Sequence, residues 1–270
     1  MVVQHNLTAM NSNRMLGVTT GSQAKSTEKL SSGYKINRAA DDAAGLAISE
    51  KMRRQIRGLS KAVSNAQDGI SCVQTAEGAL AEVHDMVQRM NELAVQAANG
   101  TNQTTDRQYL DSEVQALKSE IDRVASSVTF NEQYLLNGDF SAGKNLQVGS
   151  ESGNVIALKI GKMDCSTIGL TGNISSQGTA EAFIDQAKGA LKTISQQRSD
   201  LGAVQNRLEH TINNLNNVVE NTTSAESQIR DTDMASEMVK YSNNNILAQA
   251  GTAMLAQANQ ANQNVLSLLG

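Results

Sequence analysis

The side chains that most often carry out chemistry in proteins are few and scattered in this chain of 270 residues. Its three histidines, His5, His84 and His210, lie far apart and have no cysteine or carboxylate at metal-site spacing. Asp41 and Asp42 form a carboxylate pair of the kind that can do acid–base chemistry. No Gly-x-Ser-x-Gly motif, phosphate loop or dinucleotide fingerprint accompanies them. We therefore predict no catalytic residue, no bound metal and no cofactor.

The two cysteines lie in different contexts. Cys72 falls in a stripe of apolar residues with helical spacing, whereas Cys165 falls in a glycine-rich segment. Two isolated cysteines make neither a metal-ligand cluster nor a disulfide framework. We interpret both as small thiols that are buried or half-buried.

The charge pattern excludes two classes of partner. The net charge is −4, and the basic run at 51–57 is balanced by acidic residues elsewhere. We interpret this run as a solvated helix face and predict no nucleic-acid binding. No stretch approaches the roughly 20 apolar residues of a membrane span, so we predict no membrane insertion. The first seven residues lack the basic start and apolar run of a secretory signal, which by itself predicts a cytoplasmic protein.

The composition favours a helical rod over a thick globular core. Aromatic residues make up 3% of the chain, and tryptophan and proline are absent. Proline usually makes up about 5% of a protein. It breaks helices, whereas Ala, Leu, Gln, Glu and Met favour them.

Apolar residues recur at alternating steps of three and four along three segments. This is the heptad pattern of helices that pack nearly parallel or antiparallel. Arg198 and Gln205 interrupt the third run, where polar residues usually set the register. The positions are Leu59, Val63, Ala66, Ile70, Val73, Ala76, Leu80, Val83, Val87, Met90, Ala94 and Ala97; Leu110, Val114, Leu117, Ile121, Val124 and Val128; and Ile184, Ala187, Leu191, Ile194, Arg198, Leu201, Gln205, Leu208, Ile212, Leu215 and Val219.

The segment 138–179 has a different character. Glycines divide it into short pieces, of which 155–160 reads as a strand with 146–148 as its partner and 149–153 as the turn. We predict that this hairpin is the only β element. A lone hairpin is marginal in water, so we expect it to fold back on an apolar face of the rod.

The two ends of the chain differ from its middle. Residues 1–40 are rich in Asn, Ser, Thr and Lys, with scattered apolar positions. Apolar residues on more than one face of the C-terminal helix imply more than one neighbour, so this helix is an oligomer interface or folds on assembly. Its seam is predicted at Leu247, Gly251, Met254, Ala258, Ala261, Val265 and Leu268, while Ile246, Leu255, Leu266 and Leu269 point elsewhere.

Both ends also carry long, specific motifs. They are NLTAMN at 6–11, EKLSSGYKINRAADDAAGLAIS at 28–49, IRDTDMASEM at 229–238 and MLAQANQ at 254–260. These stretches resemble the terminal regions of bacterial flagellins, and the resemblance covers about 1–140 and 180–270. The chain departs from the family pattern at Gln228, where many relatives have Arg, and at 261–262, a region where many have Pro. Only about 40 residues fill the middle, so the chain resembles a short flagellin without variable outer domains.

The resemblance implies a mainly α fold, a long helical rod and coiled-coil bundle with a small β-hairpin region. Helices at about 2–33 and 230–270 would pair at the filament core, and Asp41 and Asp42 would fall in a structural bend. The implied domains are the N-terminal part of the filament-core helical domain with the bend (1–40), the N-terminal part of the rod domain (41–140), the hairpin region (141–179), the C-terminal rod helix (180–225) and the C-terminal part of the filament-core domain (226–270).

The implied function is that of a non-enzymatic subunit that polymerises into the flagellar filament for motility. The implied partners are other copies of the chain, an export chaperone, and the filament cap and hook-associated proteins. Flagellins are exported unfolded through the flagellum's own channel without a cleaved signal peptide, which reverses the cytoplasmic prediction. A chain without proline has no slow prolyl isomerisation to complete after export.

The resemblance also assigns candidate site residues. For assembly they are Leu7, Met10, Leu247, Met254, Leu255, Val265 and Leu268. Flagellins bind vertebrate Toll-like receptor 5 through the long rod helix and its neighbour, and the matching residues here are Arg89, Glu92, Leu93 and Glu113. Arg89 and Leu93 are four residues apart and are expected to share one helix face.

Two other functions remain open from the residues alone. A hook–filament junction protein resembles flagellin at its ends, and a secreted helical effector or adhesin would act as a monomer. A C-terminal helix with a single apolar face would favour the monomer, and this chain lacks that feature.

Overall fold

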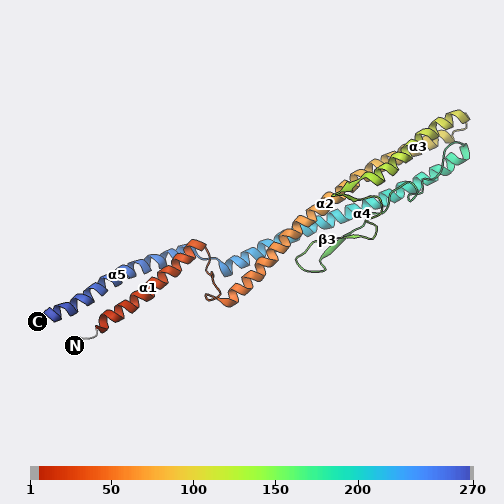
Figure 1. Ribbon diagram of the computed structural model, residues 1–270. Coiled ribbons are helices and arrows are strands. Elements are labelled where there is room, and N and C mark those ends of the chain that lie inside the picture. The colour runs from red at the N-terminus through yellow and green to blue at the C-terminus, as the bar shows by residue number, and fades with distance from the viewer. Residues whose placement is uncertain (1–5, 268–270) are drawn as a thin grey trace. The chain divides into compact units, whose positions relative to one another are not determined.

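The computed structural model describes residues 6–267, with side chains described up to Gln260. This part of the chain is mainly helical, which confirms the predicted fold class (Figure 1). The helices are α1 (Leu7–Ser32), α2 (Ala43–Ala98), α3 (Thr104–Ser127), α4 (Gln177–Arg230) and α5 (Met234–Ser267). The strands are β1 (Thr129–Phe130), β2 (Gln133–Tyr134), β3 (Lys144–Gln147) and β4 (Val155–Leu158).

The chain divides into two compact units. The end unit comprises residues 1–56 and 220–270, and the rod unit comprises residues 57–219. The sequence places the corresponding boundaries at 40/41 and 225/226. The start of α2 and the last turns of α4 therefore group with the end helices rather than with the rod.

The core of the rod unit lies between α2, α3 and α4, which run side by side in Figure 1. The predicted heptad positions from Ala76 to Ala97 are all buried, and those of α3 and α4 are buried or half-buried, which confirms the three seams. The polar interruptions have polar partners: Arg198 forms an ion pair with Glu77 of α2 at 3.7 Å, and Gln205 donates to Glu209 at 2.9 Å.

The predicted hairpin is confirmed with slightly shifted bounds. β3 and β4 pair antiparallel, with Leu146 opposite Ile156. Ile156 and Val148 pack on Ala66 of α2 and Leu208 of α4, so the hairpin folds back on the rod as expected. Gly69 permits this approach, because a Cβ at this position would lie only 2.6 Å from Leu146 Cδ1.

A second hairpin shows that the prediction of a single β element is wrong. β1 and β2 pair antiparallel, with Thr129 opposite Tyr134. The two residues between the strands, Asn131 (φ 49°) and Glu132 (φ 62°), both have positive φ, as a type I′ turn requires. Strands of two residues are too short to show alternation, and Asn131 is the only turn signal in the sequence.

Side chains of α3 and α4 hold the irregular segment 159–176 in place. The Cys165 N–H donates to Asp122 and the Ile174 N–H donates to Asp111, each at 2.8 Å. The Gly172 N–H donates to Gln186 of α4 at 3.0 Å, and the Lys118 ammonium donates to the Gly172 carbonyl. Because this segment lacks strand partners along most of its length, these side chains satisfy backbone groups that would otherwise be buried and unpaired.

Candidate functional site

The contact between α1 and α5 in the end unit is made by small and polar side chains. The least exposed positions of both helices recur at steps of three and four, as in a coiled coil. Leu16, Leu30 and Leu255 are the leucines of this contact, and the Asn6 amide donates to the Ala258 carbonyl at 3.0 Å. The positions are Ala9, Ser12, Leu16, Thr19, Gln23, Ser26 and Leu30 in α1, and Glu237, Tyr241, Asn244, Ala248, Gly251, Leu255 and Ala258 in α5.

This arrangement corrects the predicted C-terminal seam. Leu247 and Met254 are 57% and 59% exposed, whereas Leu255 is half-buried. The prediction followed the large apolar residues, but α5 turns its small and polar residues toward α1. From Leu247 to Ala258, where side chains are described, the predicted seam is thus shared between two faces, of which the one with Gly251 and Ala258 contacts α1. Its positions Ala261, Val265 and Leu268 lie outside the described side chains.

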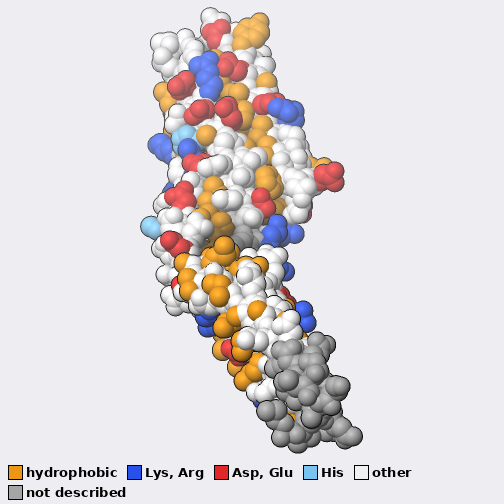
Figure 2. Space-filling model, turned by 90° about the vertical axis from the view of Figure 1, so that its left-hand side faces the viewer, with side chains coloured by type: hydrophobic (Ala, Val, Ile, Leu, Met, Phe, Trp, Pro, Cys, Tyr) orange, Lys and Arg blue, Asp and Glu red, His pale blue; other side chains and the backbone are white. Residues whose placement is uncertain are grey.

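Large apolar side chains instead cover the outside of the end unit. Figure 2 shows hydrophobic side chains over this unit in the lower half of the view, where charged side chains are few. Fully burying one such side chain contributes roughly 1.5–3 kcal/mol, so an outward-facing set favours association. The exposed residues are Leu7, Met10, Met15 and Val18 in α1, and Met234, Met238, Val239, Ile246, Leu247 and Met254 in α5.

Charge is nearly absent from the same helices. Arg14 is the only Asp, Glu, Lys or Arg between Leu7 and Ala24, and there is none from Tyr241 to Gly270. A surface without charge does not repel a copy of itself and loses little solvation when it is covered. The outer faces of α1 and α5 thus have the chemistry of an interface between subunits.

The predicted assembly residues therefore fall into three groups. Leu7, Met10, Leu247 and Met254 point outward, where a second molecule can cover them. Leu255 lies in the α1–α5 seam. The side chains of Val265 and Leu268 lie outside the part of the chain whose side chains the structure describes. Sequence reasoning missed Met15, Val18, Met234, Met238 and Val239 as members of the exposed set.

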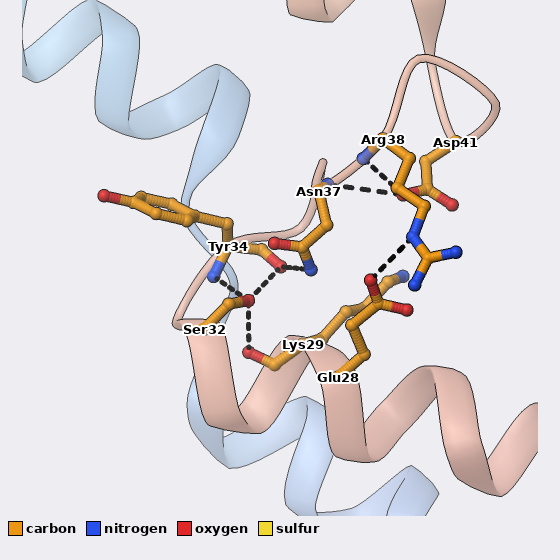
Figure 3. A network of polar contacts seen from close by, with 7 residues as sticks. All are labelled: Glu28, Lys29, Ser32, Tyr34, Asn37, Arg38 and Asp41. Carbon is orange, nitrogen blue, oxygen red and sulfur yellow. Dashed lines mark hydrogen bonds and ion pairs between the residues drawn. The ribbon is translucent and has the colours of Figure 1, made fainter.

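A polar network fixes the bend between α1 and α2 (Figure 3). The Asp41 carboxylate accepts from the Arg38 N–H at 3.0 Å and the Asn37 N–H at 3.3 Å, and the Arg38 N–H lowers the pKa of this carboxyl. Arg38 also donates to Glu28 of α1 at 3.0 Å. The Asp42 carboxylate accepts from the Gly45 N–H at 2.9 Å and so caps the start of α2. Both carboxylates therefore hold the backbone in its turn, as the resemblance implies.

Arg230 ties this bend to the link between α4 and α5. Its guanidinium lies 4.6 Å from the centre of the Tyr34 ring and 2.8 Å from Glu50. Two backbone hydrogen bonds join the same segments, from Lys35 N–H to Arg230 and from Thr232 N–H to Gly33, at 2.6 and 2.9 Å. Gly33 has φ 76°, which a residue with a side chain rarely adopts. The sequence alone does not predict this role of Arg230, because a lone Arg near a helix end carries no pairing signal.

The structure brings together Arg89, Glu92 and Glu113 of the four residues that the resemblance assigns to receptor binding. Arg89 of α2 donates to Glu113 of α3 at 3.0 Å and to Glu92 at 3.2 Å. These carboxylates, Glu113 first, raise the pKa of the guanidinium. All three side chains are exposed, so they form a charged patch across two helices that a protein partner can reach.

Leu93 does not share this exposed face. Its side chain is 1% exposed and belongs to the core with Met90 and Ala97. Arg89 and Leu93 are one helical turn apart, but only Arg89 is exposed, so the two side chains do not form one accessible surface. The physical reason is that α2 packs against its neighbours over a broad face, and position 93 falls inside it.

The cysteines are both free, and both are buried, which confirms the predicted burial. Burial raises the pKa of Cys72, and burial together with the Asp122 carboxylate raises the pKa of Cys165 to about 12. Since the thiolate is the reactive form, its fraction at pH 8 falls by roughly a thousandfold for Cys165 relative to an exposed thiol.

We therefore expect neither thiol of the native protein to react with iodoacetamide at pH 8 in the time that fully labels the urea-unfolded chain. Mass spectrometry of the two cysteine peptides measures this. Labelling of Cys165 at the same rate in native and unfolded protein would show that the site is open.

Three further signals of a functional site are incomplete or absent in the described residues. Residues 138–144 have the spacing Gly-x-x-x-x-Gly-Lys, but Asn145 follows and the segment enters strand β3 rather than a helix, so no phosphate cradle forms. Within the described residues, no three His, Cys, Asp or Glu side chains are grouped as metal ligands. None of the helices in this part of the chain is long and apolar enough to cross a membrane.

Most of the chain is similar to known protein families. Residues 3–141 match the family described as bacterial flagellin N-terminal helical region, and residues 184–269 match the bacterial flagellin C-terminal helical region. A flagellin of Halalkalibacterium halodurans is 54% identical over 272 residues and covers 100% of both chains. A flagellin of Bacillus subtilis is 47% identical over 303 residues, again with 100% of both chains covered.

A solved structure shares the fold. The crystal structure of Bacillus cereus flagellin is 34% identical, with a TM-score of 0.51, and the match covers 56% of this chain and 88% of that one.

Proposed function

The chain belongs to the bacterial flagellin family and is a structural subunit of the extracellular flagellar filament, and we propose that its end unit is the part that polymerises. Only about 40 residues separate the two terminal family regions. The chain is thus a short form, and its assembly surfaces must lie on the end helices and the rod.

The observation that carries this proposal is the inverted character of the α1–α5 pair. Small and polar side chains fill most of its seam, which holds only Leu16, Leu30, Tyr241 and Leu255 as large residues with apolar character. Large apolar side chains such as Met10, Ile246 and Met254 face outward, each about 60% exposed. A two-helix unit that had to be stable in water alone would place them the other way round. Seeded polymerisation of the chain with and without residues 255–270 tests the role, and filaments are expected from the intact chain only.

The same proposal includes the export of the chain and the proteins that it contacts before it joins the filament. A surface as apolar as that of α5 aggregates unless it is shielded before assembly, which is the task of an export chaperone. We propose export through the flagellar channel without a cleaved signal peptide, followed by contact with the filament cap and hook-associated proteins. No catalytic step enters this function.

A second role, as a ligand of Toll-like receptor 5, rests on Arg89, Glu92 and Glu113. Their exposed charged patch spans α2 and α3 in the rod unit, and Arg is a favoured residue at the centre of protein interfaces. Buried Leu93 would act by fixing the position of Arg89, one helical turn away, rather than by contacting the receptor.

We expect Arg89→Ala to weaken binding to the receptor ectodomain at least tenfold while leaving rod stability within about 1 kcal/mol of the original. The reason is that exposed ion pairs contribute little to folding, whereas a central Arg of an interface contributes much to binding. Surface plasmon resonance of monomeric protein measures the affinity. Arg123→Ala is the matched control, because Arg123 is also exposed and paired with a glutamate on α3. Equal affinity for Arg89→Ala and the original chain would refute the role.

A further inference from the structure

The end unit carries two apolar surfaces of different shape. The first is a groove of about 330 Å³ beside the α1–α5 seam. Its walls and floor include Met15, Leu16, Thr19, Leu247, Gly251 and Met254, and no charged residue lines it. A dry apolar cavity of about 150 Å³ already accommodates a benzene ring. The groove therefore has room for an aliphatic side chain of another molecule.

Gly251 keeps this groove open. A Cβ at this position would lie 3.2 Å from Leu16 Cδ1, which is tighter than ordinary van der Waals contact. A larger residue would push α5 away from α1 or fill the space between Met15 and Met254. Glycine is also a poor helix former, so its presence in the middle of α5 is explained by packing rather than by helix stability.

The second surface is a stripe on the back of α1. Leu7, Met10, Arg14 and Val18 follow one another at steps of three and four and are all exposed. At 3.6 residues per turn they lie on the side of α1 opposite its seam residues. Arg14 is the only charge in the stripe, and it donates to Asn11 at 3.0 Å. Its long apolar stem can line a contact while its guanidinium stays at the edge.

We propose that the stripe of one subunit docks in the groove of a second copy of the chain. This inference rests on the proposed role of the end unit in assembly and specifies its contact. Stripe and groove lie on different faces of one molecule, so the contact is heterologous. A dimer formed by a heterologous contact still has one free stripe and one free groove, so further copies can add. Such contacts generate open helical polymers when the rotation that relates neighbouring subunits does not close into a ring.

The composition of both surfaces identifies the occupant as another copy. The groove offers methionine and leucine side chains with a polar rim of Asn11, Ser12 and Thr19, and the stripe offers the same aliphatic types with one cation at its edge. An acidic or strongly basic partner would find no counter-charge in the groove. The filament supplies the matching surface at high local concentration, since each subunit carries both halves.

Disulfide cross-linking tests the contact. In a Cys72→Ala, Cys165→Ala background, Met10→Cys places a thiol on the stripe and Met254→Cys places one on the groove wall. When both are on one chain, mild oxidation of filaments should give a ladder of covalent dimers, trimers and longer chains on a denaturing gel. The control pair is Asn13→Cys with Met254→Cys, because Asn13 is exposed on α1 but lies in neither the seam nor the stripe.

Each outcome decides the proposal. Filaments of the Met10→Cys, Met254→Cys chain that give no ladder overturn the docking but leave the end unit's role in assembly intact. Cross-linked dimers from Met10→Cys alone would indicate a two-fold contact and also overturn it, as would an equal ladder from the control pair. If the double variant does not polymerise, the two single variants are co-assembled with excess cysteine-free chain, and dimers between them are expected. Their absence counts against the contact.

Discussion

Deletion of residues 255–270 should abolish filament formation while the rod unit stays folded. The deleted segment contains Leu255, Val265, Leu266 and two further leucines, and no charged residue. If only two of these side chains are buried between subunits, the subunit affinity falls by about 3–6 kcal/mol. That raises the critical concentration roughly 10²- to 10⁴-fold. Sedimentation after seeding, with negative-stain electron microscopy of the pellet, measures the filament yield.

The control for this truncation must keep the length of α5. Gln257→Ala changes an exposed polar side chain within the deleted segment and should polymerise like the original chain. Circular dichroism of the truncated monomer should retain the helical signal of the rod unit. Normal filaments from the truncated chain would remove the C-terminal helix from the assembly mechanism.

The second large effect is expected in the core of the rod unit, from Phe183→Ala. Phe183 is 0% exposed, and the Lys118 ammonium lies 5.2 Å from the centre of its ring. Phe-to-Ala substitutions in well-packed cores typically cost 3–5 kcal/mol, because they remove transfer free energy and leave a cavity. The same change removes the ring over which Lys118 extends to hold Gly172, so the irregular segment should loosen as well.

Urea unfolding of the rod unit, followed by circular dichroism, measures this loss as a lower midpoint with an unchanged slope. Tyr109→Ala is the matched aromatic control on α3, since Tyr109 is 77% exposed and its removal should change the free energy of unfolding by less than about 0.5 kcal/mol. A loss below 1 kcal/mol for Phe183→Ala would show that the core collapses around the missing ring.

The rod could be predicted from sequence because the apolar residues at heptad spacing are the ones that its helices bury. Leu80, Val87 and Ala94 in α2, and Ile194, Leu201 and Leu208 in α4, are apolar at heptad spacing and are buried in the core. The hairpin β3–β4 was predictable for a similar reason, since Val155–Leu158 is a β-prone run flanked by glycines. β1–β2 was not, because two residues per strand give no pattern to detect.

The same reasoning failed for the end unit because its large apolar residues lie on the exposed faces of α1 and α5 rather than between the two helices. In a folded monomer the large apolar residues mark the inner face of a helix, so the spacing predicts Leu247 and Met254 in the seam. The structure exposes them and turns Ala248, Gly251 and Leu255 toward α1. The structure pairs Arg89 with Glu113, two of the residues that the family motif singles out, while spacing alone could not show that Leu93 lies in the core.

If the end unit is the part that polymerises, the outward-facing side chains of α1 and α5 become buried when the filament forms. Methionine oxidation by hydrogen peroxide, read by mass spectrometry in monomer and in filament, tests it most directly. Met10, Met15, Met238 and Met254 are 56–64% exposed in the single chain, whereas Met90 is fully buried in the rod and serves as the internal reference. We expect at least Met10 and Met254 to be oxidised rapidly in the monomer and at least tenfold more slowly in the filament. Equal oxidation of these two methionines in both states would contradict it.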